Sequence, residues 1–320
     1  MKDSFGRVID YARISVTKTC NMRCEYCMPL PHFQMVEDTN ILSDDEILTI
    51  LSAMSEIGIS KIRLTGGEPL CRTGIPALIG RMRDSFPAME ITMTTNGVLL
   101  EKYAGELKRV GLNRVNISLD SLDAKRYQAI TGSDLLPEVL RGIAAAQAAG
   151  FEKIRLNTVL LRGINEVDIL PLITWTLSEN IDVRFIELMP IGRTKDYCSE
   201  HFFSAQAVLD RVAELVPEPA SHLHEASSYF RLPGGKGRVG LIRPLSCKFC
   251  SSCNRIRVTA EGVLKPCLLS DQSVSLREYS DGCHSEELVS AIRRAVLNKP
   301  AAHLLEQQIT SDTSMYCIGG

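Results

Sequence analysis

Three cysteines near the start of the chain have a spacing that suits a metal centre. Cys20, Cys24 and Cys27 stand in the run Cys-Asn-Met-Arg-Cys-Glu-Tyr-Cys, which lets one loop wrap three thiols around a single centre. A cubane iron–sulfur cluster takes four ligands, so three thiolates leave one iron open to a substrate. A zinc ion held by the same thiols and by a distant residue such as His32 is the alternative.

A second cysteine triad lies nearer the other end of the chain. Cys250 and Cys253 are followed, across two expected strands, by Cys267. These thiols suit a second cluster with an open iron. Cys247 could instead complete a closed zinc ribbon with a purely structural role. The spacing alone leaves both interpretations open.

A glycine-rich turn accompanies the first triad. Gly66-Gly67-Glu68-Pro69 directly follows an expected strand. Two glycines let the backbone approach a ligand closely, and the Glu68 carboxylate can accept hydrogen bonds from an ammonium group. Taken by itself, this motif is a weak signal.

Alternating strand and helix patterns must position these motifs. Between about residues 10 and 190, short runs rich in Val, Ile and Thr alternate with segments of helical periodicity, which is typical of βα units and a parallel sheet. Ser43 and Glu46 form the pattern of a capping box that opens a helix. Six such units predict an α/β fold, an incomplete (β/α)6 barrel of TIM type. The expected strands are Ala12–Thr17, Lys61–Thr65, Glu90–Thr94, Arg114–Ser118, Lys153–Leu160 and Asp182–Leu188.

Several of these strands alternate between polar and apolar residues. A strand packed between helices and a filled barrel interior would be almost continuously apolar. The alternation therefore predicts an open barrel around a charged, hydrated cavity, whereas an antiparallel sheet with one solvated face is the alternative. The residues on the polar face are Arg63, Thr65, Thr92, Thr94, Asn116, Ser118, Arg155 and Asn157.

The pattern changes past about residue 220. Short strands are expected over 238–242, 255–259 and 262–265, followed by a helix over 286–297. We therefore predict two domains, a partial barrel over residues 1–220 and a smaller iron–sulfur and substrate-binding domain over 221–320. The final Gly319-Gly320 pair is expected to be mobile unless it is docked.

Composition and charge limit the kinds of partner. The 320 residues carry a net charge of −2, which argues against a broad surface for nucleic acid or membranes. The N-terminus lacks the apolar run of a secretory signal, and no stretch reaches the roughly 20 apolar residues of a spanning helix. The 11 cysteines, several in tight runs, favour thiolate ligation in a reducing compartment over a disulfide framework. A cytoplasmic protein is expected.

The first triad and the glycine turn, on successive βα units, resemble the motifs of the radical S-adenosylmethionine superfamily. The resemblance implies that Cys20, Cys24 and Cys27 hold a [4Fe–4S] cluster whose open iron chelates S-adenosylmethionine, and whose reduction releases a 5′-deoxyadenosyl radical. The implied S-adenosylmethionine contacts are Tyr26, Gly67, Ser118 and Met189. For two of them a structural role is the alternative: Ser118 could cap the next helix, and Met189 could fill the core.

A second resemblance extends over essentially the whole chain. The segments DSFGRVIDYARISVTKTCNMRCEYCMP, FIELMPIG, FCSSCNRIRVTAEGVLKPCL and MYCIGG are similar to those of the GTP 3′,8-cyclase family. This implies conversion of GTP to (8S)-3′,8-cyclo-7,8-dihydroguanosine 5′-triphosphate, the first step of molybdenum cofactor (molybdopterin) biosynthesis. It also implies a second [4Fe–4S] cluster on Cys250, Cys253 and Cys267, with guanine bound at its open iron.

The same resemblance implies a GTP site rich in arginine, whose guanidinium forks suit a triphosphate. The family typically has Lys where this chain has Arg155, so this contact departs from the family pattern. Arg255 and Arg257 are also implied to assist the reduction step, and Gly319 and Gly320 to enter the active site. The implied GTP contacts are Arg13, Arg63, Thr94, Arg155, Arg184, Asn254, Arg255 and Arg257.

Partners follow from the resemblance as well. It implies a reductant such as a flavodoxin or ferredoxin, a downstream cyclic pyranopterin monophosphate synthase, and a homodimer. Three other functions remain open: a radical S-adenosylmethionine enzyme that modifies a peptide and carries an auxiliary cluster, an electron-transfer protein with two clusters, and a zinc-scaffold binding protein. Open positions in both triads speak against electron transfer.

Overall fold

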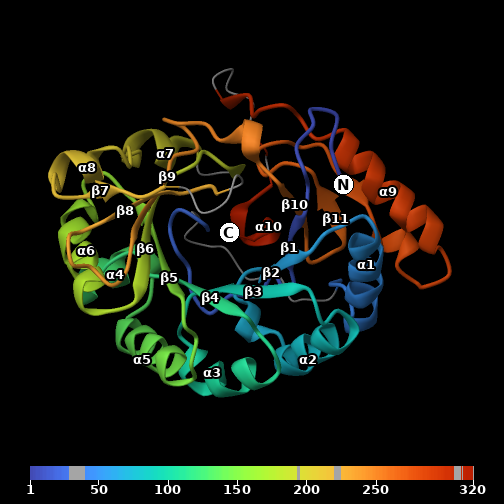
Figure 1. Ribbon diagram of the computed structural model, residues 1–320, viewed down its shortest axis with the longest axis horizontal. Helices are drawn as coiled ribbons and strands as arrows, with labels where there is room; N and C mark the ends of the chain where they lie inside the picture. Colours follow the sequence, from blue (N-terminus) through green and yellow to red (C-terminus); the bar gives the residue numbers. More distant parts are fainter. Residues whose placement is uncertain (29–39, 193–194, 220–224, 306–310, 312, 320) are drawn as a thin grey trace.

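A twelve-stranded sheet curls around the centre of the molecule (Figure 1). The computed structural model describes residues 1–28, 40–192, 195–219, 225–305, 311 and 313–319. The strand order is β12-β11-β10-β1-β2-β3-β4-β5-β6-β9-β8-β7, and the eight strands from β10 to β9 run parallel. The antiparallel alternative is therefore excluded for the barrel strands.

The six strands expected from the sequence are all present and neighbour one another in chain order. The expected bounds of the second and fourth strands are matched residue for residue, and those of the others differ by one or two residues at one or both ends. These strands are β1 (Tyr11–Ser15), β2 (Lys61–Thr65), β3 (Glu90–Thr95), β4 (Arg114–Ser118), β5 (Ile154–Leu160) and β6 (Ile181–Glu187).

Helices cover the outside of these strands (Figure 1). The Ser43 hydroxyl accepts from the Glu46 amide at 3.2 Å, and the Glu46 carboxylate accepts from the Ser43 amide at 2.7 Å, which confirms the capping box. Both bonds satisfy backbone donors that a helix start leaves free. The helices are α1 (Asp44–Glu56), α2 (Ile75–Ser85), α3 (Leu100–Arg109), α4 (Ala124–Thr131), α5 (Leu136–Ala148) and α6 (Ile169–Ser178).

The C-terminal third extends the sheet at both edges. Strand β9 (Val239–Ile242) adds to β6, and β10 (Arg255–Val258) adds to β1, both in parallel. The two ends of the sheet are antiparallel hairpins, which involve β7 (Val216–Pro217), β8 (Ser228–Arg231), β11 (Val263–Lys265) and β12 (Val274–Ser275). The remaining helices are α7 (Lys195–His201), α8 (Ala207–Arg211), α9 (Ser285–Leu297) and α10 (Met315–Ile318).

The two faces of the barrel strands have the predicted polarity. Ile62, Leu64 and Ile91 are fully buried in the core between strands and helices. Arg63 and Asn116 are also buried, but on the opposite face, which lines the inside of the curled sheet. No helix in the described ranges is long and apolar enough to cross a membrane.

Candidate active site

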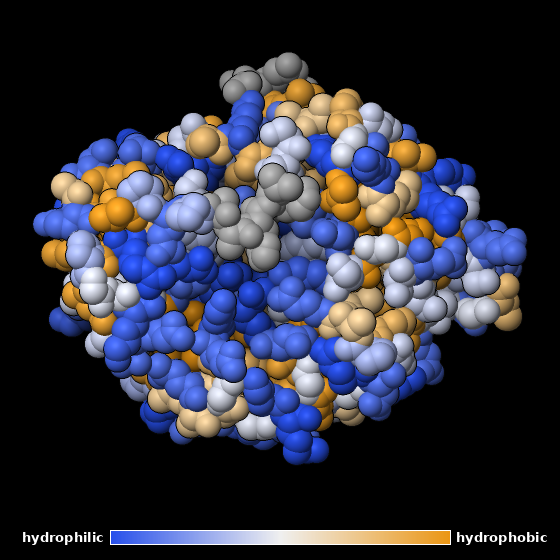
Figure 2. All heavy atoms as spheres, viewed as in Figure 1, coloured by the Kyte–Doolittle hydropathy of each residue, from blue (hydrophilic) through white to orange (hydrophobic). Residues whose placement is uncertain are grey.

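Both cysteine triads line one cavity of about 310 Å³ inside the curled sheet. Figure 2 has the same view as Figure 1 and shows hydrophilic side chains gathered around the middle of this face. The cavity also contains the glycine turn and four of the eight expected GTP contacts. The predicted site residues that line it are Arg13, Cys20, Cys24, Tyr26, Cys27, Gly67, Thr94, Ser118, Met189, Cys250, Cys253, Arg255, Arg257 and Cys267.

The first triad lies on the loop that follows β1, at the carboxyl end of the parallel strands, where active sites of such folds lie. The Cys20 sulfur accepts from the Met22 amide at 3.5 Å. Burial raises the pKa of Cys20 and of Cys27 to about 12, and it also raises the pKa of Cys24, which the neighbouring thiols raise further. Neighbouring thiolates repel one another, so three free thiolates are unfavourable here. Bound metal would stabilise them, because its positive charge offsets theirs.

The glycine turn packs directly beneath this loop. A Cβ at Gly67 would collide with the backbone oxygen of Thr19 and would lie 2.6 Å from that of Lys18. The buried Glu68 carboxylate accepts from the Leu70 amide at 3.0 Å and from the Asn96 amide at 2.6 Å. Only glycine fits between the turn and the loop, because any side chain would displace the residue next to Cys20.

Tyr26 lines the cavity together with the first triad. Its hydroxyl donates to the Asp120 carboxylate at 2.7 Å, and burial raises the pKa of Asp120 to about 6. Ser118 lines the cavity and does not cap the next helix, because Asp123 accepts from the Arg126 amide there at 2.9 Å. Asp120 was not expected from the sequence, although its place just after a barrel strand is the signal that could have found it.

The second triad lies opposite the first. Burial alone would raise the pKa of the Cys253 thiol, but the charges of Arg255 and Lys299 lower it to about 6. The Arg255 guanidinium lies 4.8 Å from the centre of the Phe249 ring. Cys247 is exposed and is absent from the cavity lining. Cys250, Cys253 and Cys267 therefore face the cavity without it.

The donor set fits iron–sulfur clusters. No group of three or more His, Cys, Asp or Glu side chains in the described residues has the geometry of a site for a single metal ion. A [4Fe–4S] cube needs a wider arrangement, because each thiolate binds a different iron. Each triad supplies three thiols to the same cavity. His32, the alternative zinc ligand, lies outside the described residues.

Arginines from neighbouring strands form layers between the triads. Arg13 is in register with Arg257 on one side and with Arg63 on the other. Burial and the charges of Arg13 and Arg184 lower the pKa of Arg63 to about 9, and burial and Arg13 lower that of Arg257. So many buried cations in one place require an anion to balance them.

A second layer lies on β4, β5 and β6. Asn116 lies between Arg63 and Arg184, and its side-chain amide satisfies both guanidinium groups when it is oriented with the oxygen toward them. Arg184 also donates to the Asn157 side chain at 2.6 Å, and the Arg155 guanidinium lies 3.6 Å from the Asp182 carboxylate.

Four expected GTP contacts do not line the cavity itself. Arg63, Arg155 and Arg184 belong to these arginine layers but are absent from the cavity lining. Asn254 instead donates to Asp10 at 2.6 Å.

The C-terminal tail is docked inside the barrel, and Figure 1 shows α10 at the centre of the ring of strands. Arg257 donates to the backbone oxygens of Gly319 and of Ile318, the latter at 3.4 Å. The backbone of Gly319 has a φ of 68°, and a Cβ there would collide with the Thr65 side chain. Gly320 lies outside the described residues.

Two family models match the chain. The model of the radical SAM superfamily matches residues 14–176, and the model described as Molybdenum Cofactor Synthesis C matches residues 181–305. The models meet just before β6, whereas the sequence predicts a domain boundary at residue 220. That boundary stays a prediction, since strands from both sides of it share one sheet.

Curated relatives match over their full length. The GTP 3′,8-cyclase of Peptoclostridium acidaminophilum is 43% identical over 319 residues, which cover 99% of this chain and 98% of the relative. The GTP 3′,8-cyclase of Alkaliphilus oremlandii is 42% identical over 322 residues and is covered completely, as is this chain.

Solved structures share the fold. Streptococcus suis SuiB bound to S-adenosylmethionine superposes with a TM-score of 0.63 at 14% identity, covering 93% of this chain and 73% of SuiB. SuiB bound to the precursor peptide SuiA gives a TM-score of 0.66, covering 97% and 76%. At this identity the likeness shows the fold, a partial α/β barrel, and the superfamily is shown by the matching family model.

Proposed function

The chain belongs to the GTP 3′,8-cyclase family of radical S-adenosylmethionine enzymes, and we propose that it converts GTP to (8S)-3′,8-cyclo-7,8-dihydroguanosine 5′-triphosphate. This is the first step of molybdenum cofactor biosynthesis. The observation that carries the proposal is that both triads and a set of arginines face one cavity. A nucleoside triphosphate is the kind of ligand that needs both features, since its phosphates match guanidinium groups and its base offers nitrogen and oxygen donors to a metal.

Two [4Fe–4S] clusters and S-adenosylmethionine are the proposed cofactors. The first cluster would be held by Cys20, Cys24 and Cys27, and the second by Cys250, Cys253 and Cys267. When bound, the first cluster and S-adenosylmethionine together supply a 5′-deoxyadenosyl radical. Tyr26, Gly67, Ser118 and Met189 would hold S-adenosylmethionine beside the first triad, which all four accompany on the cavity wall.

The arginine layers would hold the triphosphate. Arg13, Arg255 and Arg257 reach the cavity from adjacent strands, and Arg63 and Arg184 lie behind them with Asn116 between. Bidentate guanidinium groups in a buried site would fix the phosphates and neutralise their charge. Binding of the triphosphate would then fix the position of the ribose in the cavity.

The reaction joins two atoms of the same substrate. Hydrogen leaves ribose C3′, C3′ bonds to guanine C8, and one electron and one proton complete the dihydro ring. The protein must hold C3′ and C8 close together and exclude water and other hydrogen donors. The second triad would fix the guanine end, and Arg255 and Arg257 would stand beside the ring during its reduction. The docked Gly319 would help to close the cavity.

Partners complete the proposal. Two one-electron steps call for a reductant such as a flavodoxin or ferredoxin, and the product would pass to a cyclic pyranopterin monophosphate synthase. A homodimer in the cytoplasm is part of the same proposal, as is a substrate-binding domain over residues 221–320.

Anaerobic reconstitution tests the function. Iron and zinc analysis would be followed by mass spectrometry of a reaction with dithionite, S-adenosylmethionine and GTP. We expect about eight irons per chain, together with 5′-deoxyadenosine and a product that has the mass of GTP but separates from it in chromatography, because the hydrogen atom lost from C3′ is replaced by one electron and one proton. About four irons and one zinc, with 5′-deoxyadenosine but no altered GTP, would contradict the cyclase. Cleavage of S-adenosylmethionine only alongside a peptide would favour the peptide-modifying alternative.

A further inference from the structure

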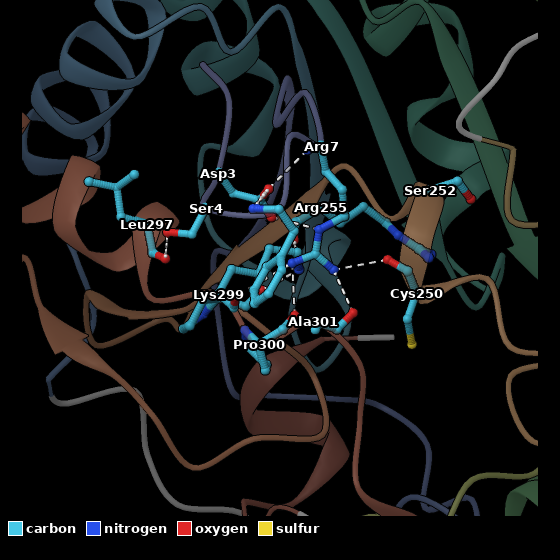
Figure 3. A network of polar contacts seen from close by, with 12 residues as sticks. Asp3, Ser4, Arg7, Cys250, Ser252, Arg255, Leu297, Lys299, Pro300 and Ala301 are labelled. Carbon is cyan, nitrogen blue, oxygen red and sulfur yellow. Dashed lines mark hydrogen bonds and ion pairs between the residues drawn. The ribbon is translucent and has the colours of Figure 1, made fainter.

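A buried arginine from the N-terminal segment reaches the loop of the second triad (Figure 3). Arg7 precedes β1 and is 6% exposed. Its Nε donates to the Asp3 carboxylate at 2.6 Å, and its Nη1 donates to the backbone oxygen of Cys250 at 2.9 Å. The same guanidinium donates to the backbone oxygens of Pro300 at 2.8 Å and Ala301 at 3.0 Å.

This arrangement uses the whole fork of the guanidinium group. Arginine has five N–H donors in a fixed plane, whereas lysine has three donors on one flexible ammonium. One side chain therefore joins three separate pieces of the chain: the N-terminal segment, the Cys250 loop and the segment after α9. Asp3 neutralises its charge, because the two side chains form a buried ion pair.

A second buried cation holds the other side of the triad. Lys299 is 2% exposed, and its Nζ donates to the backbone oxygens of Arg255 at 2.9 Å and Pro266 at 2.6 Å. Pro266 directly precedes Cys267, and Arg255 lies two residues after Cys253. Lys299 thus links the two chain segments that carry these thiols.

Lys299 is a buried cation without a carboxylate partner in the described part of the chain. Among the described residues, no carboxylate forms an ion pair with Lys299, although its side chain lies in the cavity wall beside the second triad. A buried, unpaired cation is costly. A cluster bound by three thiolates carries negative charge, so it would supply the missing anion.

We propose that Arg7 and Lys299 are positioning residues of the second cluster, Arg7 by fixing the Cys250 loop and Lys299 by joining the Cys253 and Cys267 segments and placing a positive charge beside the cluster. This inference rests on the proposed function, which assigns that cluster to Cys250, Cys253 and Cys267. Neither residue touches the reacting atoms; both act through the thiols.

Three variants test the proposal in the full-length, anaerobically reconstituted enzyme. Lys299→Met keeps most of the side-chain volume and removes the charge, Lys299→Arg restores the charge, and Arg7→Lys keeps a cation but loses the fork. Ser4→Ala is the matched control, because the Ser4 hydroxyl donates to the Leu297 backbone oxygen at 2.6 Å in the same network without reaching the triad. Formation of 5′-deoxyadenosine from S-adenosylmethionine reports the first cluster and the fold in every sample.

Electron paramagnetic resonance and potentiometry then read out the second cluster. We expect Lys299→Met to keep 5′-deoxyadenosine formation while the midpoint potential of the second cluster falls, since the reduced form gains a negative charge that the lysine no longer offsets. Lys299→Arg should restore the potential. For Arg7→Lys we expect iron to fall from about eight toward about four per chain, with the signal of the first cluster retained.

The outcomes separate this inference from the function on which it rests. Wild-type protein with only about four irons would overturn the second cluster itself and, with it, the proposed function. Wild-type protein with both clusters, and variants whose iron content, spectra and potentials match those of Ser4→Ala, would overturn the positioning roles alone. Equal loss of both clusters in Lys299→Met and Arg7→Lys, with a lower Tm, would also overturn them, because it would indicate a general role in folding.

Discussion

At the scale of single residues, Arg155 stands where the sequence resemblance implies Lys in the family. Its guanidinium lies 3.6 Å from the Asp182 carboxylate, and its side chain is 13% exposed. Asn116 on β4 is in register with it. If Arg155 contributes its charge to phosphate binding, Arg155→Lys should stay within about threefold of the wild-type KM for GTP, whereas Arg155→Met should raise the KM at least about tenfold.

Steady-state kinetics with GTP measure this difference. Arg109→Met on the outer helix α3 is the control, because its side chain is 72% exposed. Equal KM values for Arg155→Met and the control would remove Arg155 from the substrate site.

Tyr11 should make the stability of the ligand-free protein depend on pH. Burial alone would raise the pKa of its hydroxyl, but Arg63, Arg13, Lys61 and Arg255 together lower that pKa to about 7. A tyrosine whose pKa is about 10 when unfolded and lower when folded stabilises the folded state most above pH 10, and this stabilisation disappears as the pH falls through about 7. Relative to Tyr11→Phe, the ligand-free wild type should therefore gain stability as the pH rises from about 7 to about 9.

Urea unfolding of both proteins across this pH range tests the prediction. Tyr103→Phe on α3 is the control for loss of a tyrosine hydroxyl outside the cavity. A difference between wild type and Tyr11→Phe that does not change with pH would show that Tyr11 stays protonated.

Sequence motifs identified the residues that carry the chemistry but not those that hold them in place. The cysteines and Gly67 stand in short patterns, so they could be found one by one. Arg7 and Lys299 act on backbone oxygens, which every residue possesses, and such contacts leave no pattern in the sequence. The perturbed pKa of Tyr11 could not be predicted either, because most of the cations around it come from β2 and β10, which are distant in the sequence.

At the scale of elements, the glycine turn and the loop of the first triad form one unit. Gly67→Ala would push a methyl group into the backbone oxygens of Thr19 and Lys18, and backbone cannot move aside as a flexible side chain can. We expect the variant to lose at least about 90% of its 5′-deoxyadenosine formation, a loss of about 1.4 kcal/mol or more in transition-state stabilisation.

The rate of 5′-deoxyadenosine formation without GTP measures this effect at the first cluster. Gly105→Ala on α3 is the matched control, because a Cβ at Gly105 meets no other atom within 4 Å. Full activity of Gly67→Ala would mean that the loop can shift without disturbing Cys20.

The C-terminal tail is a second element with a role of its own. Gly319→Ala combines a left-handed φ of 68° with a collision against Thr65, so the tail should leave its place in the barrel. We expect the cyclised product to fall at least about tenfold while 5′-deoxyadenosine still forms, because the cavity loses part of its closure but not the first triad.

Product and 5′-deoxyadenosine measured in one reaction distinguish these effects. Gly282→Ala is the control: it has a similar φ of 84°, and a Cβ there meets nothing within 4 Å. An unchanged product yield for Gly319→Ala would remove the tail from the mechanism.

The elements themselves were largely predictable. Every barrel strand has a local signal, and the βα order implies parallel neighbours. The pairing of β9 with β6 and of β10 with β1 was not predictable, since these strands are only four residues long. Their partners are chosen by long-range packing, which makes the C-terminal segments part of the barrel sheet and not a separate layer.

At the scale of the whole molecule, the sheet brings together two metal sites that are far apart in the sequence. The first triad follows β1, and the second precedes and follows β10, its direct neighbour. Because β1 and β10 run parallel, the first triad lies beyond the carboxyl end of β1, whereas the second triad lies at the amino end of β10, to which the antiparallel β11 returns Cys267. This arrangement predicts that the two triads have separable tasks on one bound substrate.

Variants of the two triads test that separation. Cys24→Ala should abolish 5′-deoxyadenosine formation and cyclisation together, because both need the first cluster. Cys267→Ala should keep 5′-deoxyadenosine formation but lower the cyclised product at least about a hundredfold, since GTP would lose its fixed guanine end. Cys283→Ala, at an exposed cysteine outside both triads, should change neither quantity. If Cys267→Ala lost 5′-deoxyadenosine as completely as Cys24→Ala does, with its iron content and Tm otherwise intact, the second triad would serve the radical step itself. Its place across the cavity from the first triad would then reflect electron delivery and not the binding of substrate.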